Sequence, residues 1–286
     1  MNQVVTPADA STPAPHRRGR HPLAERIPAT RRFAYRRHPL AERMPATRRF
    51  AYRTRYLINA YPTLYMPMAR IRHRHSDDYC VSRETDIVIE GFGRAGNTFA
   101  WLAFTSAQPT PIRVVHHTHA AAQVITAVNL GVPTLVLVRP PLDAALSHMA
   151  RNDVTARMAL VAWTRFHRSI LPHANGFVVS SFAEVTTDFG TTIERVNRRF
   201  GTEFGVFQHT KETELSVFDQ IKARNRRRFG EHATRDGGKA PGLPTPELET
   251  RKQMLRAELE SEQLADLRSR AQRIFDALVP AAGASA

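Results

Sequence analysis

The feature that most constrains the fold of this 286-residue chain is the segment of residues 86–99, which reads DIVIEGFGRAGNTF. Its apolar run predicts a buried strand, its glycines predict a tight loop, and the residues from Asn97 onward predict a helix. The spacing of Gly91, Gly96 and Thr98 fits the phosphate-loop pattern G-x-x-x-x-G-K-[ST], except that Asn97 replaces the lysine. Such loops point backbone N–H groups at an anion, and the helix N-terminus adds partial positive charge. We therefore expect this loop to bind a phosphate.

Strands and helices alternate after this loop. Repeated β–loop–α units predict a parallel sheet flanked by helices on both faces, with ligands at the carboxyl ends of the strands. We therefore expect an α/β, P-loop-like domain over residues 84–280, closed by one long amphipathic helix at about 247–279. The expected strands are 86–90, 113–117, 134–139 and 176–181, and the expected helices are about 97–106, 120–130, 141–148, 154–171 and 191–200, with further helix beyond Phe207.

The first 75 residues hold most of the chain's positive charge. They contain 16 Arg, no Lys and three acids, which gives +13 of the total net charge of +15. Within them, residues 21–37 recur as residues 38–54 with two differences, and two copies are too few for a solenoid. We expect residues 1–75 to form a basic, mostly disordered arm of low order. Contact of this arm with an anionic lipid surface or with nucleic acid, and an organelle transit peptide, are the alternatives.

Charge, cysteine content and hydropathy narrow the class of protein. The residues beyond 75 carry a net charge of only +2, so we expect no nucleic-acid binding by the globular domain. Cys80 is the only cysteine, which leaves no partner for an intramolecular disulfide and fits a reducing compartment. No window reaches the ~18 apolar residues that span a bilayer. We therefore expect a cytoplasmic protein without a transmembrane segment.

The residues around the loop favour phosphate chemistry without a metal ion. Nucleotide-hydrolysing phosphate loops use a lysine on the terminal phosphates and a carboxylate at a neighbouring strand end to hold Mg²⁺. Here Asn97 replaces the lysine, and the strand at 134–139 ends in Arg139. Arg94, within the loop, can stabilise negative charge that develops on a leaving group. The sequence thus predicts a cationic nucleotide site with no metal ligands.

Three motifs then resemble one family in order and spacing over about 60 residues. The loop GFGRAGNTF looks like the 5′-phosphosulfate loop of the PAPS-dependent sulfotransferases, and Arg94 falls on its catalytic cation. Arg139 followed eight residues later by Ser147 is similar to the family's 3′-phosphate element. His117-Thr-His119 resembles the family's Lys-Thr-His, in which the histidine is the general base. Two departures are that His117 replaces a lysine and that the family's C-terminal R-K-G-x-x-G-D-W element has no recognisable counterpart.

The resemblance implies an enzyme that moves the sulfuryl group of PAPS to a hydroxyl or amine of a small-molecule or glycan acceptor. His119 would accept the acceptor's proton and Arg94 would stabilise the departing phosphate. Among the three arginines at 226–228, Arg227 is the candidate to complete the 3′-phosphate clamp. The implied cofactor-binding set is Gly93, Arg94, Ala95, Gly96, Asn97, Thr98, Phe99, Arg139, Ser147 and Arg227, with no metal ligand.

Other interpretations of the same residues stay open. The loop could belong to a metal-dependent nucleotide kinase or ATPase, or to a nucleotide-binding protein without activity. His116, His117 and His119 could bind a metal, but residues one and two apart on a strand do not converge tetrahedrally. Trp101 and Trp163 lie in apolar helical segments and are expected in the core, not against a nucleotide base.

Overall fold

The computed structural model describes residues 45–74, 76–230, 243 and 245–279. The chain divides into two units, residues 1–38 and 39–286, and every described residue falls in the second unit. The first copy of the tandem repeat, at 21–37, lies outside the described residues, as does most of the 237–246 segment. None of the described helices is long and apolar enough to cross a membrane.

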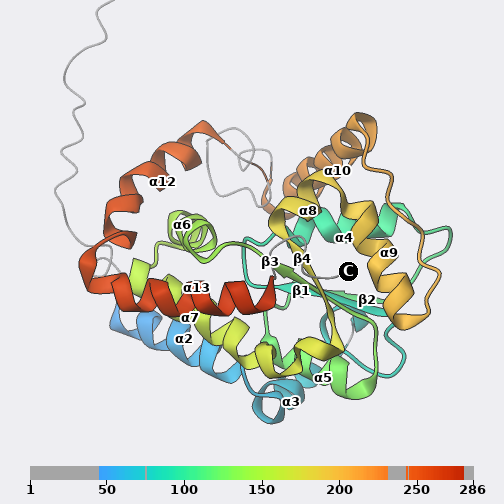
Figure 1. Ribbon diagram of the computed structural model, residues 1–286, viewed down its shortest axis with the longest axis horizontal. Helices are drawn as coiled ribbons and strands as arrows, with labels where there is room; N and C mark the ends of the chain where they lie inside the picture. The colour runs from blue at the N-terminus through green and yellow to red at the C-terminus, as the bar shows by residue number, and fades with distance from the viewer. Residues whose placement is uncertain (1–44, 75, 231–242, 244, 280–286) are drawn as a thin grey trace, which may run out of the picture. The chain divides into compact units, whose positions relative to one another are not determined.

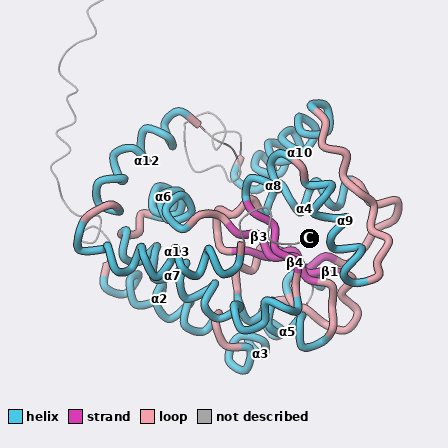
Figure 2. Tube along the Cα trace, viewed as in Figure 1, coloured by secondary structure: helices cyan, strands magenta, loops and turns pink. Residues whose placement is uncertain are grey.

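A four-stranded parallel sheet forms the centre of the second unit, as predicted (Figure 2). The strands lie in the order β2-β1-β3-β4, so β1 and β3 occupy the middle. Ile89 of β1 lies opposite His116 of β2 and Leu135 of β3, and Val136 pairs with Val179 of β4. The strand bounds are β1 Ile87–Gly91, β2 Val114–His116, β3 Thr134–Val138 and β4 Val178–Ser181.

Both faces of the sheet are covered by helices (Figure 1). Ile89 and Leu137 pack into a core with α4, α8, α9 and α10, whereas Val136 and Val138 pack on the opposite face with α5, α6 and α7. This is why the strands read as unbroken apolar runs in the sequence. The bounds are α4 Asn97–Ser106, α5 Ala121–Leu130, α6 Pro141–Asn152, α7 Ala156–Ile170, α8 Phe182–Thr187, α9 Phe189–Phe200 and α10 Lys211–Phe229.

Part of the predicted low-order arm is instead helical and packs against the domain. Residues 46–72 contain α2 (Ala46–Ile58) and α3 (Pro62–Arg72). Tyr56 is buried in the core shared with α7, and Met66 is buried beside Val88 and Val115. Pro45 precedes α2 and Pro62 begins α3, positions where a missing N–H costs little, whereas Pro67 lies inside α3. The domain therefore begins well before residue 84.

The predicted long C-terminal helix is broken into two. It consists of α12 (Pro246–Leu259) and α13 (Ala265–Leu278), joined by the short 3₁₀ turn Glu262–Leu264. Arg268 of α13 donates hydrogen bonds to the carbonyl oxygens of Leu259 and Ser261 and so stabilises the corner. The corner has neither glycine nor proline, which removed the usual sequence signal for a helix end.

Candidate functional site

The sequence-predicted residues come together where the parallel strands end. The loop of residues 92–96 follows β1, His117 and His119 follow β2, and Arg139 follows β3. Three of the four non-glycine residues with positive φ in the described part of the chain lie here: Arg94 at 78°, His117 at 59° and His119 at 53°. Backbone strain of this kind persists only where the surrounding structure holds it, and it clusters at functional sites.

The glycine loop has the geometry of an anion-binding turn. Gly96 has φ 91° and precedes the first residue of α4, so the loop turns directly into a helix N-terminus. A side chain at Gly91 would place its Cβ 2.4 Å from the carbonyl oxygen of Leu137, so only glycine fits there. Asn97 donates from Nδ2 to the carbonyl oxygen of Phe92 at 3.1 Å. Asn97, in the lysine's position, thus ties the loop to itself instead of reaching toward a ligand.

Arginine side chains converge beside this loop. Nε of Arg94 donates to Oγ of the fully buried Ser147 at 2.8 Å, and Arg139 donates to the carbonyl oxygen of Arg94 at 3.2 Å. Burial, together with the charges of Arg151 and Arg139, lowers the pKa of Arg94 to about 10. Buried cations that repel one another are costly unless an anion accompanies them. The cluster is therefore suited to a ligand with several negative charges.

Arg139 has a donor atom left over. Its guanidinium lies 4.2 Å from the centroid of the Phe182 ring, and its Nε is buried without a hydrogen-bond partner among the described residues. Its backbone carbonyl accepts from Nε1 of Trp163, which is fully buried in the core as predicted. The side chain is thus held in place by stacking and by its hydrogen bond to the loop, with one buried donor left without a partner among the described residues.

The imidazole ring of His119 is held against the glycine loop. Its Nδ1 lies 2.8 Å from the carbonyl oxygen of Gly91. Because a carbonyl oxygen can only accept, Nδ1 carries the proton and Nε2 keeps its lone pair. Burial, with a further contribution from the positive charges of Arg55 and Arg94, lowers the pKa of His119 to about 4. The imidazole is therefore neutral at pH 7 and able to accept a proton at Nε2.

Glu90 is a site residue that the sequence analysis missed. Its side chain is fully buried at the end of β1, and it accepts from the backbone N–H groups of Thr118 at 2.6 Å and His119 at 3.0 Å. Burial raises the pKa of this carboxyl group to about 7. Glu90 thus fixes the segment that carries His119 against the phosphate loop. The available signal was an acid inside an otherwise apolar strand, which requires hydrogen-bond donors around it.

The other histidines serve different contacts. Nε2 of His117 lies 2.9 Å from Oγ1 of Thr98, the hydroxyl predicted to contact phosphate, and His116 stacks on Trp101 at 4.2 Å. Burial lowers the pKa of His117 well below its ordinary value. Trp101 is only half-buried, unlike the core position expected for it. Among the described residues, no group of three or more metal-ligating side chains is placed to hold a metal ion.

Helix α10 carries Arg227, the residue predicted to complete the clamp, together with Arg224 and Arg228. The positive charges of Arg224 and Arg228 contribute, after burial, to lowering the pKa of His117, and Arg228 also affects Arg151. Arg224 lies over the ring of Trp101 at 5.3 Å. Arg227 and Arg228 are both exposed. They lie three and four residues after Arg224, so both neighbour it on the helix surface.

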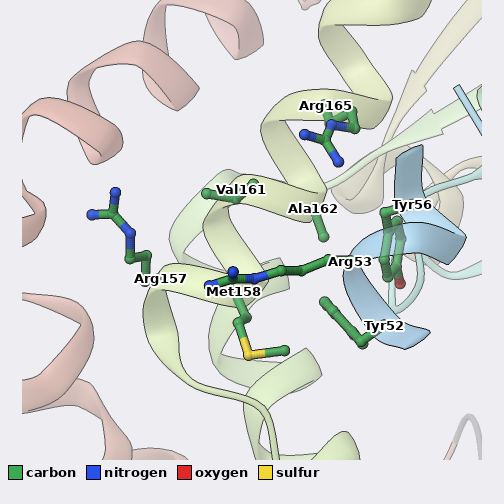
Figure 3. A pocket seen from close by; sticks show the side chains of 8 residues that line it. All are labelled: Tyr52, Arg53, Tyr56, Arg157, Met158, Val161, Ala162 and Arg165. Atoms are coloured by element: carbon green, nitrogen blue, oxygen red, sulfur yellow. The ribbon is translucent and has the colours of Figure 1, made fainter. Parts of the chain in front are cut away.

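Helix α2 reaches the loop from the segment assigned to the arm. The hydroxyls of Tyr52 and Tyr56 lie 2.9 and 3.4 Å from Nε2 of His148, whose ring covers Gly93: a Cβ there would lie 3.4 Å from its Nδ1. Tyr52 and Tyr56 also line a cavity of about 290 Å³ between α2 and α7 (Figure 3). Its lining is Tyr52, Arg53, Tyr56, Arg157, Met158, Val161, Ala162 and Arg165.

Comparison with known proteins adds little to this geometry. No protein-family model matches the sequence, and no curated protein sequence matches it. Among solved structures, the chain is similar to the mouse sulfotransferase SULT7A1 in complex with PAP. The TM-score is 0.38 and the identity 15%, and the match covers 69% of this chain and 90% of that chain. A likeness of this size assigns neither a family nor an activity, so the functional argument rests on the residues of the site.

Proposed function

We propose that the chain is a sulfotransferase that moves a sulfuryl group from PAPS to a hydroxyl or amine of an acceptor. The observation that carries the proposal is the position of His119, whose Nδ1 is bonded to the carbonyl oxygen of Gly91 in the phosphate loop itself. A neutral imidazole with a free Nε2 therefore lies beside an arginine-rich anion site. This combination suits transfer from a phosphate-bearing donor to a group that must lose a proton.

The residues at the strand ends fit such a donor. PAPS, when bound, supplies the sulfuryl group and brings a 3′-phosphate and a 5′-phosphosulfate. Two observations support a ligand with negatively charged oxygens. Nε of Arg139 has no partner among the described residues, and the positive charge of Arg151 acts on that of Arg94. We assign Arg139 and Ser147 to the 3′-phosphate, and the loop N–H groups from Gly96 to Thr98 to the 5′ side. Gly93, Ala95 and Phe99 would shape the loop that presents these groups.

Within this proposal, each residue at the loop has one task. Nε2 of His119 accepts the proton of the acceptor's O–H or N–H group, while Nδ1 keeps its proton on the carbonyl oxygen of Gly91. Glu90 holds the backbone of His119 in place. Arg94 stabilises the negative charge of the departing phosphate. Arginines and backbone N–H groups supply all the positive charge in this scheme, so the proposal assigns no metal ion.

We extend the proposal to the acceptor and to the place in the cell where the protein acts. A small molecule or glycan that carries a hydroxyl or amine satisfies the chemistry of His119, and we expect the protein to act in the cytoplasm. The kinase or ATPase alternative is not favoured by the site. Asn97 is folded back onto the loop, and the Glu90 carboxylate is buried among three backbone N–H groups, where it is not available to hold Mg²⁺.

Turnover of labelled PAPS with a panel of hydroxyl and amine acceptors tests the proposal. We expect His119→Ala to lower kcat by about 10²–10⁴-fold, the usual contribution of a general base, with unchanged affinity for adenosine 3′,5′-bisphosphate. Because burial lowers the pKa of His119 to about 4, its base form persists as pH falls, so protonation of His119 should not lower wild-type kcat/KM between pH 8 and about 5; a fall near pH 7 would report protonation of Glu90, whose pKa is about 7.

A matched variant, His173→Ala, should leave transfer unchanged. His173 lies in the 3₁₀ turn before β4, at the opposite edge of the sheet from the site. Unchanged transfer by His119→Ala would overturn the assignment of the base. Tighter binding of ATP with Mg²⁺ than of adenosine 3′,5′-bisphosphate would overturn the proposed function.

A further inference from the structure

Exposed large apolar side chains gather on α2 and α3. Eight such residues occur in the described part of the chain, and six of them fall between residues 50 and 71, with exposed fractions from 44% to 74%. Scattered single apolar residues on a surface are normal, whereas a local concentration marks an interaction site. We name this set the α2–α3 surface: Phe50, Leu57, Tyr61, Leu64, Met68 and Ile71.

On α3 these residues form one continuous stripe. Tyr61 at the N-cap is followed by Leu64, Met68 and Ile71, at spacings of three, four and three residues that place them on one side of the helix. The core does not need this stripe, because Met66 and Ala69 are the buried residues with which α3 packs against the domain. The helix therefore presents a second apolar face outward.

The same two helices are strongly basic. Residues 45–74 contain seven arginines and no aspartate or glutamate. Arg48, Arg53 and Arg72 are all exposed. An apolar helix face flanked by arginines, with aromatic residues such as Phe50 and Tyr61 among the exposed side chains, is the pattern of helices that lie in the interface of an anionic membrane.

We propose that the α2–α3 surface docks the protein on an anionic lipid bilayer. The arginines complement lipid phosphates, and Leu64, Met68 and Ile71 enter the boundary between headgroups and acyl chains. Residues 1–44 carry nine arginines against three acids, so their like charge disfavours them as the cover of this surface. A nucleic acid would use the arginines but would leave the aliphatic stripe without a role.

Co-sedimentation of the full chain with vesicles tests this docking. We expect binding to vesicles of phosphatidylcholine with ~30% phosphatidylglycerol, weak binding to phosphatidylcholine alone, and loss of binding as salt screens the charges. The triple variant Leu64→Ser, Met68→Ser, Ile71→Ser should bind about a hundredfold more weakly because it loses the apolar contribution. The double variant Arg48→Gln, Arg72→Gln should bind at least about tenfold more weakly.

The control is Leu215→Ser with Met254→Ser, the two large exposed apolar residues that the described part of the chain has outside the α2–α3 surface, and this variant should bind vesicles as the wild type does. Unchanged thermal midpoints show that the variants fold. Wild-type vesicle binding by the serine triple variant would overturn the proposal. Tighter binding of the wild type to a duplex oligonucleotide than to vesicles would also overturn it. A third contrary result would be a wild-type protein that does not bind vesicles but forms a dimer, if the serine triple variant is monomeric.

Discussion

Two sets of arginines in this chain are placed in opposite ways. At the carboxyl ends of the strands, Arg94 lies mostly buried, and burial plus neighbouring cations lowers its pKa to about 10. On α2 and α3, Arg48, Arg53 and Arg72 are exposed, where charge costs little. A buried cluster of cations is unfavourable by itself; in our proposals the anionic donor balances this cluster, and the exposed arginines attract an anionic lipid surface. Composition alone could not separate these two uses of the same residue type.

The largest effect, on the free energy of unfolding, should come from removing α2. Its inner face carries the buried Tyr56, and its exposed residues include Arg48 and Arg53. Deleting residues 1–60 removes the buried Tyr56 and the contacts of Tyr52 and Tyr56 with His148. We expect the free energy of unfolding to fall by about 3–5 kcal/mol, the usual cost of losing a large buried aromatic side chain. Denaturant titration measures this. Deleting residues 1–44 is the control and should leave the midpoint unchanged, because it retains every described helix; equal stability of both truncations would show that α2 contributes only its exposed face.

The phosphate loop and the sheet could be predicted because their signals are local. The pattern from Gly91 to Thr98 and the apolar runs of β1 and β3 each determine their own conformation, and α4 begins at the predicted Asn97. The helices α2 and α3, in the second half of the predicted arm, could not be predicted in the same way. Its helices are fixed by contacts with residues far along the chain, such as Tyr56 with the core of α7 and Tyr52 with His148.

The site was predicted only as far as its motifs reach. His119 and Arg139 stand in recognisable patterns, and the structure places both at the carboxyl edge of the sheet. Glu90 has no motif, because its function depends on the backbone N–H groups of Thr118 and His119, which only the fold brings to it. Arg227 and Arg228 are indistinguishable in sequence and are both exposed; they differ in that the charge of Arg228 contributes to lowering the pKa values of His117 and Arg151.

The second-largest effect should come from Arg94→Met, which tests the buried set directly. We expect kcat for transfer to fall by about 10²–10³-fold, the usual cost of one donor at a developing negative charge. The thermal midpoint should not fall, because relief of the buried charge beside Arg139 and Arg151 offsets the lost hydrogen bond to Ser147. Calorimetry and single-turnover kinetics measure the two quantities. The exposed Arg168 provides the matched control, and Arg168→Met should change neither; a large loss of stability in Arg94→Met would show that the buried arginine is structural.

The smallest effect should distinguish Arg228 from Arg227, two exposed arginines of α10. Arg228 lies near enough to Arg151 and His117 for its charge to lower their pKa values, so Arg228→Gln should weaken binding of adenosine 3′,5′-bisphosphate about threefold to fivefold. Arg227→Gln should leave the affinity unchanged. Titration calorimetry at low and at raised salt measures both, and the Arg228 effect should shrink with salt because the side chain is partly in water. A larger loss in Arg227→Gln would restore Arg227 as the clamp and would mean that ligand binding turns α10 relative to its position in this structure.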